Sequence, residues 1–176
     1  MDKSGYAALL TKKSSRCLLV RPRRQGKSLL LTTIQCLLER KENLFRGLAV
    51  HDKIDWHDGS VSVITFDLSK AHATDGKDPM EGRKIFQEDL RNQVRDNAER
   101  LEVEVAEGMP YRMFETLLLA VSKKTDGKKK AAVLIDEYDA PLLEVLAKTA
   151  GRWTSAFETR ARRCTSFCSL PSRARI

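Results

Sequence analysis

The segment that most constrains the fold of this chain runs from Cys17 to Ile34 and reads CLLVRPRRQGKSLLLTTI. Its apolar start predicts a short buried strand over Arg16–Val20, and Pro22 marks the turn that follows. Apolar residues then recur at helical spacing, which predicts a helix from Lys27 to about Arg40. A strand, a basic loop and a helix that begins at Gly-Lys-Ser form the layout of a phosphate-binding loop.

The Gly-Lys-Ser triplet supplies the groups that such a loop needs. A helix N-terminus presents unpaired N–H groups that favour phosphate, and Gly26 lets the backbone approach the anion. Lys27 would reach the β- and γ-phosphates, and the Ser28 hydroxyl would bind Mg²⁺. Arg21 replaces the first glycine of the usual G-x-x-x-x-G-K-[ST] pattern, so the triplet alone is a weak signal. The nucleotide-binding residues predicted here are Arg24, Gln25, Gly26, Lys27, Ser28 and Leu29, although loop arginines are more often simply solvated.

A second motif, AAVLIDEYD, places two acidic residues at the end of a strand predicted over Ala131–Ile135. Asp136 would hold Mg²⁺, and Glu137 would act as the general base toward an attacking water. The alternative is an acidic strand end that caps the following helix, a role that suits Asp139 before a helix over Pro141–Lys148. The pairing of the two motifs favours a nucleotide site over coincidence.

The other elements predict an α/β fold with a parallel sheet covered by helices on both faces, because each strand is a continuous apolar run. Asp67 ends one of these strands, where it would either line the site or cap the next loop. The longest helix is highly charged and reads as a solvated amphipathic cover. The predicted elements are a strand over Val61–Leu68 and helices over Arg83–Val105 and Tyr111–Ser122.

Composition fits a globular protein, and the formal net charge of +8 lies mostly in the last part of the chain. Residues 151–176 hold six arginines and one glutamate, so this tail would attract nucleic acid or be a solvated, disordered end, which we favour. We therefore expect one domain over residues 1–150 and a basic tail. No apolar run approaches the roughly 20 residues of a membrane span, and no secretory signal is visible, which predicts a cytoplasmic protein.

Four segments together resemble the AAA-ATPase-like domain family of bacterial proteins. They are Asp2-Lys3-Ser4, RPRRQGKSLLLTT (21–33), VSVITFDLS (61–69) and VLIDEYDAPL (133–142), in the order of the family. The resemblance implies a three-layer P-loop NTPase-type sheet, ATP binding and hydrolysis with Mg²⁺. It also implies that arginine at position 21 is normal, whereas Gln25 stands where the family usually has an aromatic residue.

The resemblance also bears on the residues after 150. Members of the family continue with a helix and a strand that carries a polar sensor residue, and often with a nuclease domain. Nothing in residues 151–176 matches that strand, so we expect a truncated chain whose sheet lacks it between the strands of the two motifs. The alternatives are a nucleic-acid-binding module that uses the basic tail, or a gene fragment without function.

Overall fold

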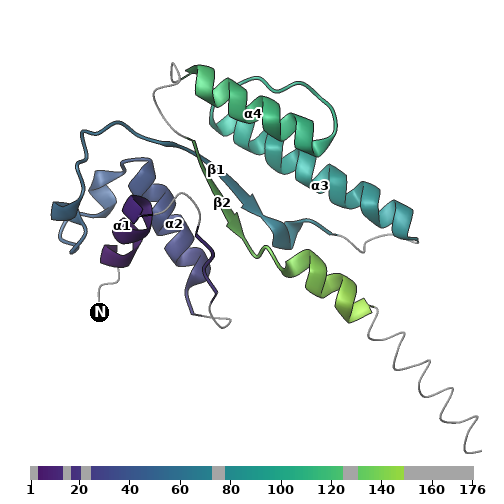
Figure 1. Ribbon diagram of the computed structural model, residues 1–176, viewed down its shortest axis with the longest axis horizontal. Helices are drawn as coiled ribbons and strands as arrows, with labels where there is room; N and C mark the ends of the chain where they lie inside the picture. Colours follow the sequence, from purple (N-terminus) through teal and green to yellow (C-terminus); the bar gives the residue numbers. More distant parts are fainter. Residues whose placement is uncertain (1–3, 14–16, 21–24, 73–77, 125–130, 149–176) are drawn as a thin grey trace, which may run out of the picture.

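A computed structural model describes residues 4–13, 17–20, 25–72, 78–124 and 131–148 of the chain (Figure 1). Two strands and four long helices form most of this part, and three short 3-10 turns lie between them. In chain order the elements are α1 (Ser4–Lys13), α2 (Lys27–Leu38), 3-10 turns at Glu42–Leu44 and His51–Lys53, β1 (Ser62–Asp67), a 3-10 turn at Leu68–Lys70, α3 (Pro79–Arg100), α4 (Pro110–Lys124) and β2 (Ala131–Asp136). A further helical segment covers residues 140–148.

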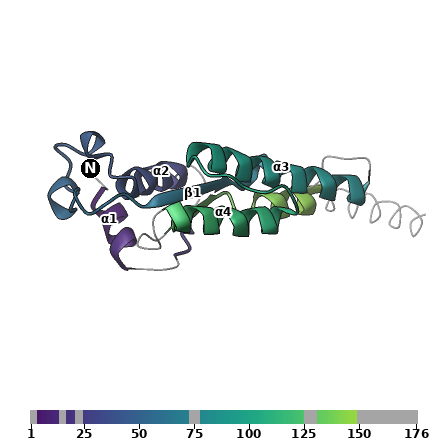
Figure 2. The ribbon, with the colours of Figure 1, turned by 90° about the horizontal axis from the view of Figure 1, so that it is seen from above.

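The two strands form a parallel sheet, as predicted. Their register runs from Ser62 opposite Ala131 to Asp67 opposite Asp136. The connection between them passes through α3 and α4, since parallel neighbours need a long crossover. The sheet lies between α2 on one side and α3 and α4 on the other (Figure 1), and α3 and α4 run side by side in both ribbon views (Figure 2). The chain is therefore of the α/β class.

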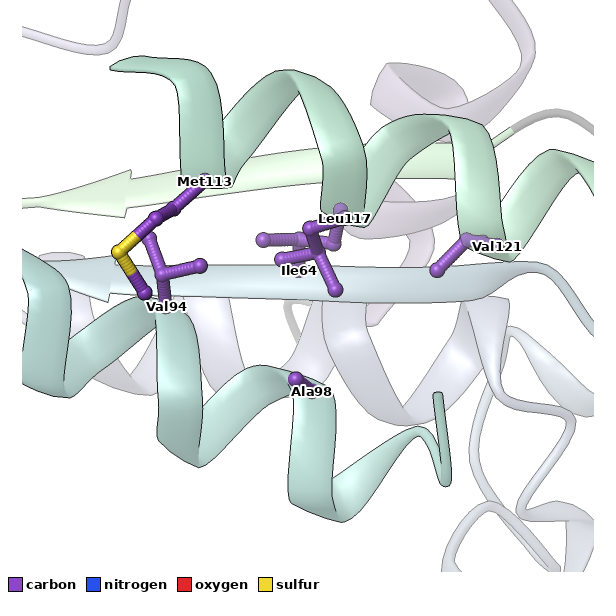
Figure 3. Packing of buried hydrophobic residues seen from close by; sticks show 6 residues of the cluster. All are labelled: Ile64, Val94, Ala98, Met113, Leu117 and Val121. Carbon is purple, nitrogen blue, oxygen red and sulfur yellow. The ribbon is translucent and has the colours of Figure 1, made fainter. Parts of the chain in front are cut away.

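One face of the sheet packs on the main hydrophobic cluster. Ile64 of β1 lies between α3 and α4 and has no exposed surface (Figure 3). Phe66 adds an edge-to-face contact with Phe114 of α4, with ring centroids 5.6 Å apart. The other buried members of this cluster are Val94, Ala98, Met113, Leu117 and Val121. Burial of these side chains fixes which face of β1 is turned toward α3 and α4.

A second cluster joins α1 to α2 and to the connector that follows α2. Phe45 and Trp56 of the connector stack with ring centroids 5.5 Å apart, and the Trp56 indole N–H donates to the His51 carbonyl oxygen. The helix α1 was not predicted from the sequence, and its two alanines are buried here. The buried members are Ala7, Ala8, Leu37, Phe45 and Val50.

The predicted strand over Arg16–Val20 is wrong in the part that the structure describes. Residues 17–20 have no strand assignment, and Leu18 and Val20 are 67% and 75% exposed. An apolar run becomes a strand only when another strand pairs with its backbone. Among the described residues β1 and β2 pair only with each other, so residues 17–20 do not join the sheet although the outer edge of β2 is open.

The predicted boundaries of α3 are also wrong, by about one turn at each end. The helix begins at Pro79 because the Asp78 side chain accepts hydrogen bonds from the N–H groups of Met80 (2.8 Å) and Glu81 (2.9 Å). It ends at Arg100, and Glu102 then adopts a left-handed φ of 51°. The other predicted elements lie within three residues of the observed bounds.

Side chains of α3 close the outer edge of β1. The Asn97 amide donates to the Thr65 carbonyl (2.7 Å) and accepts from the Thr65 N–H (2.9 Å). The Gln93 amide does the same for Asp67, at 3.0 and 2.9 Å. The spacing explains the fit, because four helical residues rise about 6 Å and two strand residues about 6.7 Å. Two amides on one face of α3 therefore take the place of a neighbouring strand.

The outer edge of β2 has no such cover. In a parallel pair, alternate residues turn their backbone groups to opposite edges, so Val133 and Ile135 face away from β1. Within the described residues, no hydrogen bond reaches the backbone groups of Val133 or Ile135 on that edge. Their side chains are 39% and 49% exposed. The sheet thus has one closed edge and one open edge.

Candidate functional site

The start of α2 has the backbone geometry of an anion site. Gly26 is the N-cap residue with φ 72° and ψ 33°, and no side chain caps the helix. A Cβ atom at Gly26 would meet nothing within 4 Å, so the left-handed φ rather than lack of space favours glycine. The first helical bond runs from the Leu30 N–H to the Gly26 carbonyl (3.0 Å), which leaves the N–H groups of residues 27–29 without helical acceptors.

The two predicted motifs meet at the carboxyl end of β2. Lys27 Nζ lies 4.0 Å from Glu137 Oε1, although the two residues are far apart in the sequence. Asp136 is the last residue of β2, and its Oδ1 accepts the Glu137 N–H at 3.0 Å. The structure therefore brings an ammonium group, a helix N-terminus and two carboxylates together at one edge of the sheet. Of the predicted nucleotide-binding residues, it describes all except Arg24.

Glu137 has an unusual backbone. Its φ is 47°, a left-handed conformation that costs most non-glycine residues of the order of 1 kcal/mol or more. The Ala140 N–H donates to the Glu137 carbonyl at 2.9 Å, which holds the turn between β2 and residues 140–148. Backbone strain of this kind is concentrated at functional sites. The Asp139 side chain makes no hydrogen bond among the described residues, and its carbonyl oxygen accepts the Leu143 N–H.

Asp67 takes the capping role that the sequence offered, and its place in the nucleotide site stays a prediction. It caps the turn after β1, since its Oδ1 accepts the Ser69 N–H (3.1 Å) and hydroxyl (2.6 Å). It also lines a cavity of about 310 Å³ together with Asp136. Partial burial raises the pKa of Asp67, but the Ser69 hydrogen bonds and the Lys70 ammonium together lower it by more. The pKa of Asp67 therefore lies below its usual value.

The cavity lies between α2 and α3 beside the carboxyl ends of both strands. Its lining joins Thr32 of α2, the two strand-end aspartates and the amides of α3, and the other lining residues are Leu31, Gln35, Thr65, Phe66, Lys70, Asp96 and Arg100. The described residues contain no group of three or more side chains of His, Cys, Asp or Glu that could hold a metal by themselves. A hydroxyl and one or two carboxylates nevertheless suit Mg²⁺, which takes its remaining ligands from phosphate and water.

His51 of the connector takes part in a local network, and the described residues form no metal cluster there. His51 Nδ1 lies 3.0 Å from Asp52 Oδ1, and His51 Nε2 lies 3.3 Å from Glu42 Oε1. Hydrogen bonds to Asp52 and Glu42 raise the pKa of His51 above its usual value. The basic tail, together with Cys164 and Cys168, lies outside the described residues.

Sequence reasoning missed the contribution of α3. Gln93 and Asn97 stand in a helix rich in charge, RKIFQEDLRNQVRDNAER, where polar residues normally face solvent. Their spacing of four residues is the only signal that they share a face. Asn97 is 4% exposed, so the face in question is buried. The helix α3, predicted as a solvated amphipathic cover, therefore also pairs with the backbone of β1, as far as Asp67 at its end.

Within the described residues, no helix combines the length and the apolar character that a membrane crossing requires. The predicted cytoplasmic location stays a prediction. No solved structure matches this chain. The "Uncharacterized protein in vnfD 5'region" of Azotobacter chroococcum mcd 1 is 32% identical over 148 residues, which cover 84% of this chain and 27% of the relative. The chain thus spans about a quarter of the length of that protein.

The model of a family described as "Predicted AAA-ATPase" matches residues 1–166, which is most of the chain and extends past the boundary predicted at residue 150. The matched range includes the start of α2, both strands and the acidic residues after β2. The chain belongs to the AAA-ATPase-like family.

Proposed function

We propose that this chain is the nucleotide-binding part of a Mg²⁺-dependent ATPase with a three-layer P-loop fold. The observation that carries the proposal is the approach of Lys27 Nζ to Glu137 Oε1 at 4.0 Å, which joins the basic and acidic motifs in one site. Membership of a family of predicted AAA-ATPases supports it. The open edge of β2 supports a larger parallel sheet in the complete fold. The domain boundary at residue 150 and a following nuclease domain stay predictions.

The start of α2 would hold the phosphates. The N–H groups of Lys27, Ser28 and Leu29 and the helix dipole favour a negative charge at this position. Lys27 pairs with Glu137 only at the limit of an ion pair, so a phosphate group would compete well for its ammonium. Arg24 and Gln25 complete the proposed binding residues on the loop side.

Ser28 and Asp136 would hold the metal ion, which offsets phosphate charge when it is bound. The Ser28 hydroxyl lies in the first turn of α2, and the Asp136 carboxylate lies at the end of β2. The only described contact of the Asp136 carboxylate is with the Glu137 N–H, at Oδ1. Its second oxygen thus has no described partner, as a metal ligand or water acceptor requires.

Glu137 would be the general base. When Lys27 turns to the phosphates, the Glu137 carboxylate loses its cation and can accept a proton from water. The water oxygen bonds to the γ-phosphorus, the bond from that phosphorus to the β–γ bridging oxygen breaks, and ADP leaves with the electron pair. The left-handed turn at Glu137 fixes where its side chain leaves the strand.

Binding of a fluorescent ATP analogue in the presence of Mg²⁺ tests the proposal. Wild type should bind, Lys27→Ala should lose at least about tenfold in affinity, and Lys41→Ala, beyond the far end of α2, should match wild type. Glu137→Gln should retain binding and release no phosphate, whereas Glu115→Gln on the exposed surface of α4 should change neither. Equal affinity of wild type and Lys27→Ala, or no binding by wild type, would refute the proposal.

A further inference from the structure

We propose that Asp67 is a further residue of this site and that Gln93 positions it. The Asp67 carboxylate, on the strand next to Asp136, would contact the metal ion through a water molecule. The inference rests on the proposed function and adds a residue to it. Asp67 belongs to neither of the motifs that define the site. The register of the sheet, and not a sequence motif, places Asp67 beside Asp136.

The register places the two aspartates side by side. Asp67 and Asp136 are Cα partners at the last position of the parallel pair, and neighbouring strands lie about 4.8 Å apart. Partners in a parallel pair turn their side chains to the same face of the sheet. In agreement, both residues line the cavity of about 310 Å³ between α2 and α3. The two carboxylates therefore share one space at the carboxyl edge of the sheet.

The backbone of Asp67 is fixed more firmly than a strand end usually is. The Gln93 amide binds both its N–H (2.9 Å) and its carbonyl (3.0 Å). One position earlier in the ladder, Asn97 holds Thr65 in the same way. After the strand, the His72 N–H donates to Asp89 Oδ2 at 3.0 Å, so α3 holds the chain on both sides of Asp67. Such support is what a group that positions a ligand requires.

The charges around Asp67 leave room for a cation. Its Oδ1 accepts hydrogen bonds from Ser69, whereas the partner of its Oδ2 among the described residues is Lys70 Nζ at 3.5 Å, on a side chain that is 72% exposed. The other cation of the cavity, Arg100, is directed to the Val63 carbonyl and to Glu39. Two neighbouring carboxylates with one loosely held ammonium attract a divalent ion that can replace that ammonium.

Water mediation follows from the chemistry of the ion. Mg²⁺ keeps several water molecules when it is held by one or two protein groups and by phosphates. Carboxylates around those waters orient the metal shell, and loss of such a partner typically weakens metal binding about 10- to 100-fold. Asp67 would therefore change the affinity for Mg²⁺ and leave the contact of the nucleotide with Lys27 intact.

A titration with metal tests this role. Binding of a fluorescent ATP analogue is followed as Mg²⁺ is raised, and Mn²⁺ in its place is followed by electron paramagnetic resonance with ADP present. Asp67→Asn should raise the half-saturating metal concentration about tenfold and leave metal-free nucleotide affinity unchanged. Glu115→Gln, which neutralises an exposed carboxylate of α4 that is not among the cavity-lining residues, should stay within about twofold of wild type.

Lys70→Ala gives a second variant at an exposed position that should leave the fold intact. Removal of the competing ammonium should lower the half-saturating metal concentration about twofold. Wild-type metal affinity in a folded Asp67→Asn, or unchanged or weaker affinity in Lys70→Ala, overturns the role of Asp67 and leaves the proposed function standing. Absence of nucleotide binding by wild type instead refutes the proposed function, and the role of Asp67 with it.

Discussion

The two outer edges of the small sheet differ in whether their backbone N–H and C=O groups are hydrogen-bonded. The outer edge of β1 is closed by Asn97 and Gln93 of α3, and the Arg100 guanidinium donates to the Val63 carbonyl beyond them. The outer edge of β2 has no hydrogen-bond partner among the described residues, and Val133 and Ile135 are exposed on it. Both strands are six residues long and end in aspartate. Strand sequence alone therefore does not decide which edge is closed.

The difference teaches that the helix after β1 sets the limit of the sheet. A strand edge that keeps free N–H and C=O groups can accept another strand, whereas one whose groups are paired cannot. The amides of α3 pair these groups at alternate residues of β1, which excludes growth of the sheet on that side. Of the two described strands, β2 alone keeps an edge that can accept a further strand, and that edge lies on the side of the sheet that carries Asp136.

The largest effect is expected for Asn97→Ala. The substitution leaves the N–H and the carbonyl of the partly buried Thr65 without their partner, and each unpaired group costs about 1–3 kcal/mol. We expect a loss of about 3 kcal/mol in the free energy of unfolding, measured in urea. Asn92→Ala on the exposed face of α3 should lose less than about 1 kcal/mol. Equal losses in the two variants would mean that the closed edge contributes nothing to stability.

A smaller loss is expected for Gln93→Ala, about 1–2 kcal/mol, since Gln93 is only half-buried and water can reach Asp67 in its absence. Urea unfolding measures it in the same series. The free energy of unfolding of Gln93→Glu should lie between those of Gln93→Ala and wild type. A carboxylate still accepts a hydrogen bond from the Asp67 N–H but cannot donate one to its carbonyl. A loss in Gln93→Ala as large as in Asn97→Ala would contradict the graded burial along the edge.

Patterns local in sequence predicted much of the fold. The β-branched run VSVITFDL and the run AAVLID became β1 and β2, and the helical spacing after Gly26 became α2. The strand predicted over Arg16–Val20 is wrong in its described part, because an apolar run does not reveal whether its backbone pairs with another strand. The closed edge was not predicted, since an amide that pairs with backbone and an amide that faces solvent look alike in a charged helix.

The candidate site was predictable where a topological rule applies. Carboxyl ends of parallel strands lie at one edge of a sheet, so the acidic residues after β2 were expected near the start of α2, and Lys27 does approach Glu137. The left-handed φ of Glu137 was not predictable, because glutamate has no preference for it. The two alternatives for Asp67 could not be separated from the sequence, since an aspartate at a strand end can cap the following turn and also line a cavity.

Low pH should decrease the free energy of unfolding through protonation of Asp67, by less than either amide substitution does. The pKa of Asp67 is lowered in the folded state, so its contribution is present above the unfolded pKa, near 3.8, and is lost as pH falls through the lower folded value. We expect less than about 1 kcal/mol, because solvent screens a side chain that is 36% exposed. Urea unfolding from pH 5 to pH 2, an interval of about three units around these values, should show a shallower decline in Asp67→Asn than in wild type.

The smallest effect is expected on the open edge. Val133→Lys replaces an exposed side chain and removes no described hydrogen bond, so the free energy of unfolding should change by less than about 0.5 kcal/mol. A lysine on an unpaired edge also opposes strand pairing between molecules, so light scattering should show less concentration-dependent association than in wild type. Leu119→Lys, at an exposed position of α4 away from the sheet edge, should leave association unchanged. A loss above about 1 kcal/mol in Val133→Lys would mean that other residues of the chain pack over β2, and the contrast between the two edges would then disappear.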